Sequence, residues 1–244
     1  MDIVIDNFKI PKGSEKYIAY QRTSYQVPII EKIFRKLGIS TLYDRYILPH
    51  IESLRTSTIR EKYYLDLKNE YLNMQAVLPA DVKNILDIGC GIAGIDLFLY
   101  YHYRNLEPNL FLLDKEGISE IFYGFKQEAA FYNSFKLATE FLQINGVPRD
   151  KIHTIDVSTD PFPINQTFDL VVSFISWGFH YPVSTYIKDV CNVISPNGVL
   201  VIDIRKDTDG EAVLKRNFKH VFLISDKKKY RRLCCSFKPI KYEK

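Results

Sequence analysis

The sequence predicts an α/β fold with a mostly parallel sheet, preceded by a helical region. Short apolar runs alternate with helical patterns after residue 84, an order typical of parallel strands joined by crossover helices. A cluster of glycines follows the first of these runs, in the segment ILDIGCGIAGIDLFL of residues 85–99. Apolar residues at near-helical spacing recur over residues 25–74, with no internal repeat and no low-complexity linker.

Length and composition predict a soluble protein with room for one α/β domain and an extension. The chain has 244 residues, of which 46% are hydrophobic and 25% charged, as in ordinary globular proteins. Its longest apolar runs are shorter than the ~20 residues of a membrane-spanning helix, and its first residues lack the basic flank of a signal peptide. The four cysteines have neither metal-ligand nor disulfide spacing, which predicts a cytoplasmic location.

The helical region is expected to form a cap over residues 1–79. Residues 1–20 are predicted to be irregular, with a Pro-Lys-Gly break at 11–13. Two helical runs follow, at residues 29–37 and 42–47. A third helix is indicated by the apolar positions Ile59, Tyr63, Leu67, Tyr71 and Met74. The second domain is then expected over residues 80–244.

The second region alternates between strands and helices. The predicted strands cover residues 84–88, 110–114, 151–156, 169–175 and 199–204. The predicted helices cover residues 126–144, 184–194 and 211–215, and a turn is expected at 195–198. The chain then closes with two strands around a short turn at 226–229, which only an antiparallel pair allows.

The glycine segment carries the strongest functional signal. Gly89, Gly91 and Gly94 fit a G-x-G-x-x-G pattern, which lets a backbone approach a ligand closely. Asp87, two residues before the first glycine, suits a cationic amine better than a pyrophosphate of like charge. With Asp87 included, the segment resembles motif I of class I S-adenosylmethionine (SAM) methyltransferases. This resemblance covers about residues 80–240 and implies a Rossmann-like sheet of seven strands, the last one antiparallel.

Two other interpretations fit the same glycines. In an NAD-binding fold, an acid about 20 residues further on binds the ribose, and Asp114 lies near that spacing. An NAD domain usually has an apolar residue where Asp87 stands, however, which favours SAM. The remaining interpretation is a strand, loop and helix in which the glycines serve packing alone.

The resemblance implies roles for residues at the strand ends. Asp114 would accept hydrogen bonds from the ribose hydroxyls of SAM, and Asp156 from the adenine amino group. The N–H of Val157 would reach an adenine ring nitrogen. The predicted donor-binding residues are together Asp87, Gly89, Cys90, Gly91, Gly94, Asp114, Lys115, Asp156, Val157 and Ser173.

The acceptor site is expected in the loop SFISWGFHYP, residues 173–182. Trp177 and Tyr181 offer an aromatic wall, and Arg205 lies at the end of the fifth predicted strand. His180 is the candidate general base, because an imidazole with a pKa near 6.5 can deprotonate a hydroxyl. The alternative is a loop histidine with structural hydrogen bonds. The loop lacks both the Asn/Asp-Pro-Pro-aromatic signature of nucleic-acid base methylation and a carboxylate for a metal, so neither nucleic acid nor metal is predicted.

The sequence therefore predicts a SAM-dependent enzyme that releases S-adenosylhomocysteine (SAH). Its acceptor is expected to be a hydroxyl of a small polar molecule, with a sugar or nucleotide-linked sugar as the candidate. An N-methyltransferase of a small amine or amino acid and a degenerate SAM-binding scaffold are the alternatives. Residues 219–244 hold nine Lys and Arg against two acids. The KKKYRR cluster at 227–232 could contact a phosphate or form a solvated hairpin turn.

Overall fold

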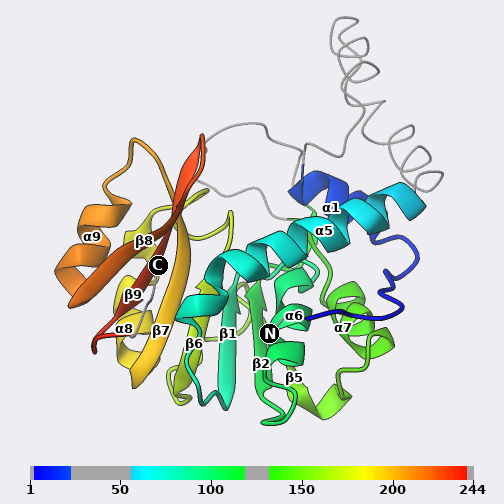
Figure 1. The fold of residues 1–244 in the computed structure, drawn as a ribbon, viewed down its shortest axis with the longest axis horizontal. Helices are drawn as coiled ribbons and strands as arrows, with labels where there is room; N and C mark the ends of the chain where they lie inside the picture. The colour runs from blue at the N-terminus through cyan, green and yellow to red at the C-terminus, as the bar shows by residue number, and fades with distance from the viewer. Residues whose placement is uncertain (1–2, 23–55, 119–131, 241–244) are drawn as a thin grey trace, which may run out of the picture.

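A seven-stranded sheet forms the centre of the protein in a computed structural model that describes residues 3–22, 56–118 and 132–240 (Figure 1). The strand order is β5-β2-β1-β6-β7-β9-β8. The strands are β1 (Asn84–Ile88), β2 (Asn109–Asp114), β5 (Ile152–Asp156), β6 (Phe168–Ser173), β7 (Ile194–Arg205), β8 (His220–Asp226) and β9 (Tyr230–Ser236). Two short strands, β3 (Gly117–Ile118) and β4 (Tyr132–Asn133), pair separately.

The sheet is parallel except at β9, which runs antiparallel to both β7 and β8. Counted along the chain, its seven strands lie in the order 3-2-1-4-5-7-6. This confirms the predicted Rossmann-like sheet with an antiparallel last strand. The hairpin turn also falls where it was predicted, between Asp226 and Tyr230, with the Lys227 N–H donating to the Tyr230 carbonyl at 2.9 Å.

Helices cover both faces of the sheet (Figure 1). One face is covered by α5 (Thr56–Met74), α6 (Gly94–His102) and α7 (Phe135–Ile144), and the other by α8 (Ile187–Val193) and α9 (Gly210–Asn217). Single 3-10 turns lie at Gln75–Val77, Arg149–Lys151 and Val183–Thr185. Cys234 and Cys235 belong to the two opposite apolar layers, because successive side chains of a strand alternate between faces.

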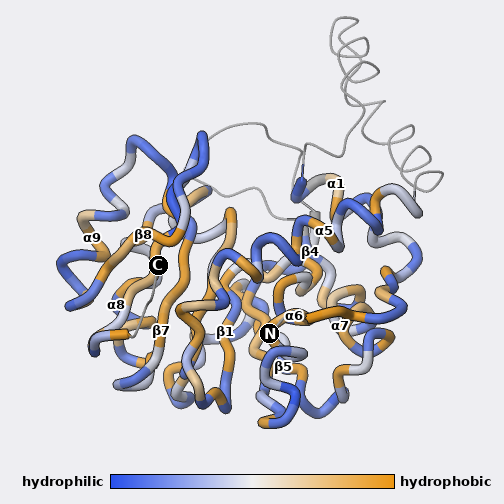
Figure 2. Tube along the Cα trace, viewed as in Figure 1, coloured by the Kyte–Doolittle hydropathy of each residue, from blue (hydrophilic) through white to orange (hydrophobic). Residues whose placement is uncertain are grey.

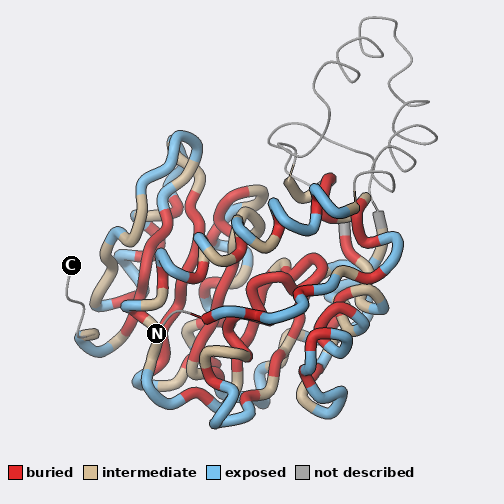
Figure 3. Tube along the Cα trace, turned by 45° about the vertical axis from the view of Figure 1, so that its right-hand side comes forward, coloured by how far each residue is buried: buried red, intermediate tan, exposed pale blue. Residues whose placement is uncertain are grey.

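Apolar and buried residues coincide in the strands. Figure 2 shows hydrophobic stretches in the central strands, and Figure 3 shows the same region buried beneath exposed loops. No helix within the described ranges is both long and apolar enough to cross a membrane.

Helix α5 packs through the face that its sequence predicted. Its buried residues are Ile59, Tyr63, Leu67, Tyr71 and Met74. The helix contacts α6 and α1, so residues before 80 pack directly on the sheet domain. The domain boundary at residue 79 stays a prediction. The helical runs predicted at 29–37 and 42–47 lie outside the described residues.

The predicted irregular segment is confirmed over residues 3–14, but residues 15–20 belong to the helix α1 (Glu15–Gln21). Such a short helix is not stable through its own propensity. It forms here because Ile18 and Ala19 are fully buried and because Glu15 accepts a hydrogen bond from Thr56 in α5 at 2.7 Å. Tertiary contacts with residues about 40 positions away supply the stability.

Two further boundaries differ from prediction. Helix α7 begins at Phe135. Its N-cap is Ser134, whose side chain accepts a hydrogen bond from the Leu137 N–H. Residues 132–133 form β4 instead, and residues 126–131 lie outside the described chain. Strand β7 begins at Ile194, so the predicted turn at 195–198 is part of the strand. Pairing of Phe168 with Ile194 extends the strand across a register shift.

Candidate active site

The glycine loop follows β1 at the carboxyl edge of the sheet, where α/β folds bind their ligands. Gly89 and Gly91 have φ angles of +82° and +55°, which L-residues with side chains rarely adopt. A Cβ at Gly91 would lie 2.3 Å from the Gln21 amide nitrogen. The Gln21 side chain at the end of α1 therefore lies against the glycine loop, and it would have to move to admit a larger residue at position 91.

The other two glycine sites are explained by packing inside the protein. A Cβ at Gly89 would lie 1.8 Å from the Ser176 hydroxyl oxygen. A Cβ at Gly94 would lie 2.0 Å from the Tyr63 phenol oxygen and 2.9 Å from Leu67. Gly94 therefore lets α6 approach α5 closely, which explains this glycine by packing, and its predicted role in binding the donor stays a prediction.

Asp114 joins the end of β2 to the glycine loop. Its carboxylate accepts hydrogen bonds from the Gly91 N–H at 2.8 Å and the Lys115 N–H at 2.7 Å. Burial raises its pKa to about 6, although both hydrogen bonds oppose that change. Each carboxylate oxygen has a further lone pair, so the group can still accept from a ligand hydroxyl.

Asp156 stands beside Asp114, because the two residues are paired in the register of β2 and β5. Asp156 accepts a hydrogen bond from the Ser158 N–H at 2.9 Å. The Val157 N–H donates to the Asp114 carbonyl at 3.0 Å. That bond uses the donor that was expected to reach the adenine ring and corrects the role given to Val157. The side chains of Lys115 and Val157 are exposed.

Asp87 is the most deeply placed acid of the predicted set, with 3% of its surface exposed. Burial, followed by the charge of Asp96, raises its pKa well above the usual range. Cys90 lies in the same interior, where burial and the neighbouring acids raise the pKa of its thiol. Asp96, in the first turn of α6, was not predicted as a site residue. It is fully buried, and burial raises its pKa to about 6.

Ser173 and Trp177 have structural roles in the loop after β6. The Ser173 hydroxyl donates to the Ile88 carbonyl at 2.7 Å and accepts from the Trp177 N–H at 3.0 Å. The Trp177 indole donates to the Val183 carbonyl at 3.1 Å, and none of its surface is exposed. The expectation of a Trp177 wall facing the acceptor is therefore corrected, because the ring packs in the core. Ser173 likewise has no exposed surface for the donor.

His180 and Arg205 lie close to each other, with the Phe179 ring in contact with both. Both are half-buried, and the Arg205 guanidinium lies 5.5 Å from the centre of the Phe179 ring. The same ring meets the His180 imidazole edge-to-face at 4.9 Å. Burial and the Arg205 charge both lower the pKa of His180, which keeps the imidazole neutral and able to accept a proton.

Tyr181 belongs to an aromatic group whose other members, Tyr186 and Phe162, were not predicted as site residues. Its phenol hydrogen-bonds Ser176, and burial raises its pKa. Tyr186 meets Tyr181 edge-to-face at 6.1 Å and stacks on Phe162 at 5.6 Å. The charge of Asp114 acts on both tyrosines. The aromatic group therefore lies near Asp114, the residue that was predicted to bind the ribose of SAM.

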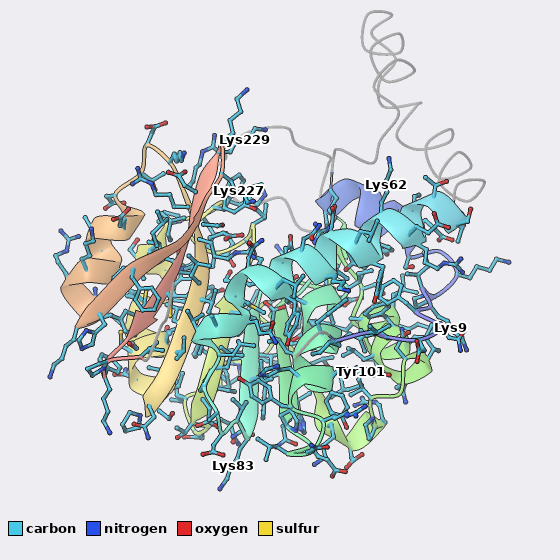
Figure 4. All side chains as sticks on the ribbon, in the orientation of Figure 1. Lys9, Lys62, Lys83, Tyr101, Lys227 and Lys229 are labelled. Carbon is cyan, nitrogen blue, oxygen red and sulfur yellow. The ribbon has the colours of Figure 1, made fainter. Side chains whose placement is uncertain are left out.

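The basic cluster at 227–232 does not act as one surface. Arg232 is 2% exposed and forms a bidentate ion pair with Asp203, at 2.7 and 2.8 Å. Arg231 contacts Glu211 at 3.1 Å. Lys227 and Lys229 project from the hairpin tip (Figure 4). Within the described chain, no three His, Cys, Asp or Glu side chains gather as metal ligands would.

Comparison with known proteins adds solved structures of similar fold. No protein-family model and no curated protein matches the sequence. A precorrin-6y C5,15-methyltransferase from Geobacter metallireducens is 15% identical, with a TM-score of 0.46, over 69% of this chain and 86% of its own. A 16S rRNA N2 methyltransferase from T. thermophilus, solved with SAM and guanosine, is 12% identical, with a TM-score of 0.47. The match covers 72% of this chain and 43% of the T. thermophilus chain. The StiE O-methyltransferase is 16% identical, with a TM-score of 0.46. The match covers 80% of this chain and 60% of the StiE chain.

These likenesses are too distant to transfer a substrate or a residue role. The fold assignment rests on the chain itself, through its strand order and the glycine loop after β1. The chain has the fold of the class I SAM-dependent methyltransferases.

Proposed function

We propose that this protein is a SAM-dependent methyltransferase that methylates a hydroxyl of a small polar acceptor. The observation that carries the proposal is the glycine loop held between two acids. Asp114 binds the Gly91 N–H, and Asp87 is almost fully buried at the end of β1. An acid-lined loop suits a cation rather than a pyrophosphate. When bound there, SAM supplies a methyl group on a positively charged sulfur.

Each part of the donor finds matching residues at this edge. Asp87 would hold the methionine ammonium, and Asp114 would accept hydrogen bonds from the ribose hydroxyls through its free lone pairs. Tyr181 and Tyr186, which both lie within the influence of the Asp114 charge, would offer an apolar wall for the adenine. The fit requires no metal.

His180 is proposed as the general base for the acceptor. Its lowered pKa favours the neutral imidazole, which can take the hydroxyl proton as the methyl group is transferred. The Arg205 charge nearby disfavours a protonated amine and favours a neutral or anionic acceptor. A sugar hydroxyl, with a phosphate or nucleotide group near Arg205, fits these requirements. The free thiols of all four cysteines favour a cytoplasmic enzyme.

Calorimetry with SAM, SAH and NAD tests the donor. We expect SAM and SAH to bind and NAD to give no heat of binding. A protein that binds NAD and neither SAM nor SAH would contradict the proposal.

Transfer of a radiolabelled methyl group from SAM tests the acceptor. Nucleotide-linked sugars, free sugars and small amines would be offered in parallel. We expect product from a hydroxyl-bearing acceptor and its loss in His180→Ala. Methylation of an amine with normal turnover in His180→Ala would favour the N-methyltransferase alternative. SAH binding without transfer to any of these acceptors would favour the scaffold alternative.

A further inference from the structure

Asp96 is a buried carboxyl with no hydrogen-bond donor among the described residues. It lies in the first turn of α6, and its residue has no exposed surface. Neither of its carboxyl oxygens accepts a hydrogen bond from an N–H or O–H group in the part of the chain that the structure describes. Buried polar groups are normally paired, and buried acids almost always.

The group within reach of Asp96 is the carboxyl of Asp87. The two side chains lie close enough to share a hydrogen bond, but only if one of the two acids carries a proton. Two ionised carboxylates have only acceptors. They can share a hydrogen bond only when one of them carries a proton, as paired carboxyls in buried sites do.

The surroundings add more negative than positive charge to this pair. Asp114 and Glu70 both act on Asp87, and the Tyr63 phenol faces both acids. Arg22 is the cation facing Tyr63, with its guanidinium 5.3 Å from the ring centre. The Arg22 charge is largely neutralised by Glu70, whose two carboxylate oxygens accept hydrogen bonds from the guanidinium at 3.2 and 3.0 Å. The Cys90 thiol beside the pair stays protonated, because burial raises its pKa.

We propose that Asp87 and Asp96 hold one proton between them in the ligand-free site, and that the methionine ammonium of the donor displaces it. The proposal rests on the proposed function, since it requires a ligand with an ammonium group. The ammonium keeps its own protons, and the proton between the carboxyls passes to solvent. The carboxylates of Asp87 and Asp96 then face one ammonium group, which donates the hydrogen bonds that the Asp96 oxygens otherwise lack.

This device makes donor binding depend on pH and on the ammonium group. Binding releases a proton, so the affinity rises with pH over the range in which the pair holds that proton. The raised pKa values of both acids place this range above the ordinary carboxyl region. A fragment with the adenosine part but no amino acid, such as 5′-methylthioadenosine, leaves the proton in place. The pair therefore selects for the amino acid end of the donor.

Calorimetry of SAH binding near neutral pH, in two buffers with different ionisation enthalpies, counts the released protons. We expect the wild type to release about one proton more than Asp96→Asn, whose amide can donate directly to Asp87. Asp81→Asn changes an exposed acid just before β1 and should match the wild type. 5′-Methylthioadenosine should release no proton from any of the three proteins. Equal proton counts for SAH in the wild type and Asp96→Asn would overturn the proposal.

Unfolding without ligand tests the pair separately. A raised pKa in the folded state means that stability is greatest at low pH and falls as pH rises through the folded-state pKa. We expect this fall in the wild type and Asp81→Asn and a smaller one in Asp96→Asn. An identical pH dependence in all three proteins would refute proton sharing. If that dependence appears as expected but neither SAM nor SAH binds, the proposed function fails and ammonium displacement fails with it.

Discussion

Removing one partner of the buried Asp203–Arg232 ion pair should lower the free energy of unfolding more than a substitution at an exposed ion pair. Asp203 in β7 lies opposite Arg232 in β9, and their exposed fractions are 0% and 2%. The two charge-assisted hydrogen bonds measure 2.7 and 2.8 Å. Breaking such a buried pair costs about 3–5 kcal/mol, because the remaining charge is left without a partner. In Asp203→Asn the amide oxygen can still accept one bond, and the Phe174 ring at 3.6 Å still faces the guanidinium. We therefore expect a loss of about 3 kcal/mol.

Urea unfolding followed by tryptophan fluorescence measures this loss, because Trp177 is the chain's single tryptophan and is fully buried. Against a total stability of about 5–15 kcal/mol, the shift in midpoint should be large. Asp226→Asn is the matched control, since Asp226 pairs with Lys206 at the exposed end of the same hairpin and should change stability little. The joint replacement of Asp203 by Leu and Arg232 by Met should recover most of the stability. A loss below about 1 kcal/mol in Asp203→Asn would show that the buried-pair argument is wrong.

Three further substitutions and a metal test examine the site. Asp114→Ala should weaken SAH binding by about 1–3 kcal/mol, the cost of leaving hydrogen-bond partners unpaired, and an unchanged Kd in calorimetry would remove it from the ribose site. Gly94→Ala should lower unfolding stability by about 1–3 kcal/mol through overpacking against α5, while an altered SAH affinity with normal stability would return this glycine to the ligand site. His180→Ala should lower kcat by about 10²–10⁴-fold and abolish a rising limb of the pH–rate profile below pH 6.5, where burial and Arg205 place the pKa of His180; retention of that limb would exclude the imidazole as base. A chelator should leave transfer unchanged, and activity restored by Mg²⁺ would contradict the metal-free site.

The fold was predictable because most of its elements have local signals. Strand β1 was predicted with its observed bounds, since a buried parallel strand reads as a continuous apolar run. The buried face of α5 follows from helical spacing alone. Helix α1 has no such signal, because seven residues become helical only through burial against a distant segment. The early start of β7 likewise depends on its pairing with Phe168.

The site was predictable only where strand ends define it. Asp87, Asp114 and Asp156 lie at the carboxyl ends of adjacent strands, so the parallel sheet brings them to one edge. Their detailed bonding depends on neighbours far along the chain, which is why the use of the Val157 N–H was not foreseen. Asp96 did leave a signal in the sequence, as the single acid in a helix whose first seven residues are otherwise apolar or aromatic.

Asp96 also bears on whether the chain binds a cation at all. A buried acid without a donor lowers stability, because the fold must either desolvate its charge or hold a proton on it. A scaffold that kept only the fold would be more stable with an amide or apolar residue there. Function often depends on groups that are unfavourable for stability, and an ammonium ligand would satisfy both oxygens of Asp96 at once. If Asp96 shares a proton as proposed, Asp96→Asn should show both effects together, with higher stability near neutral pH and weaker SAH binding.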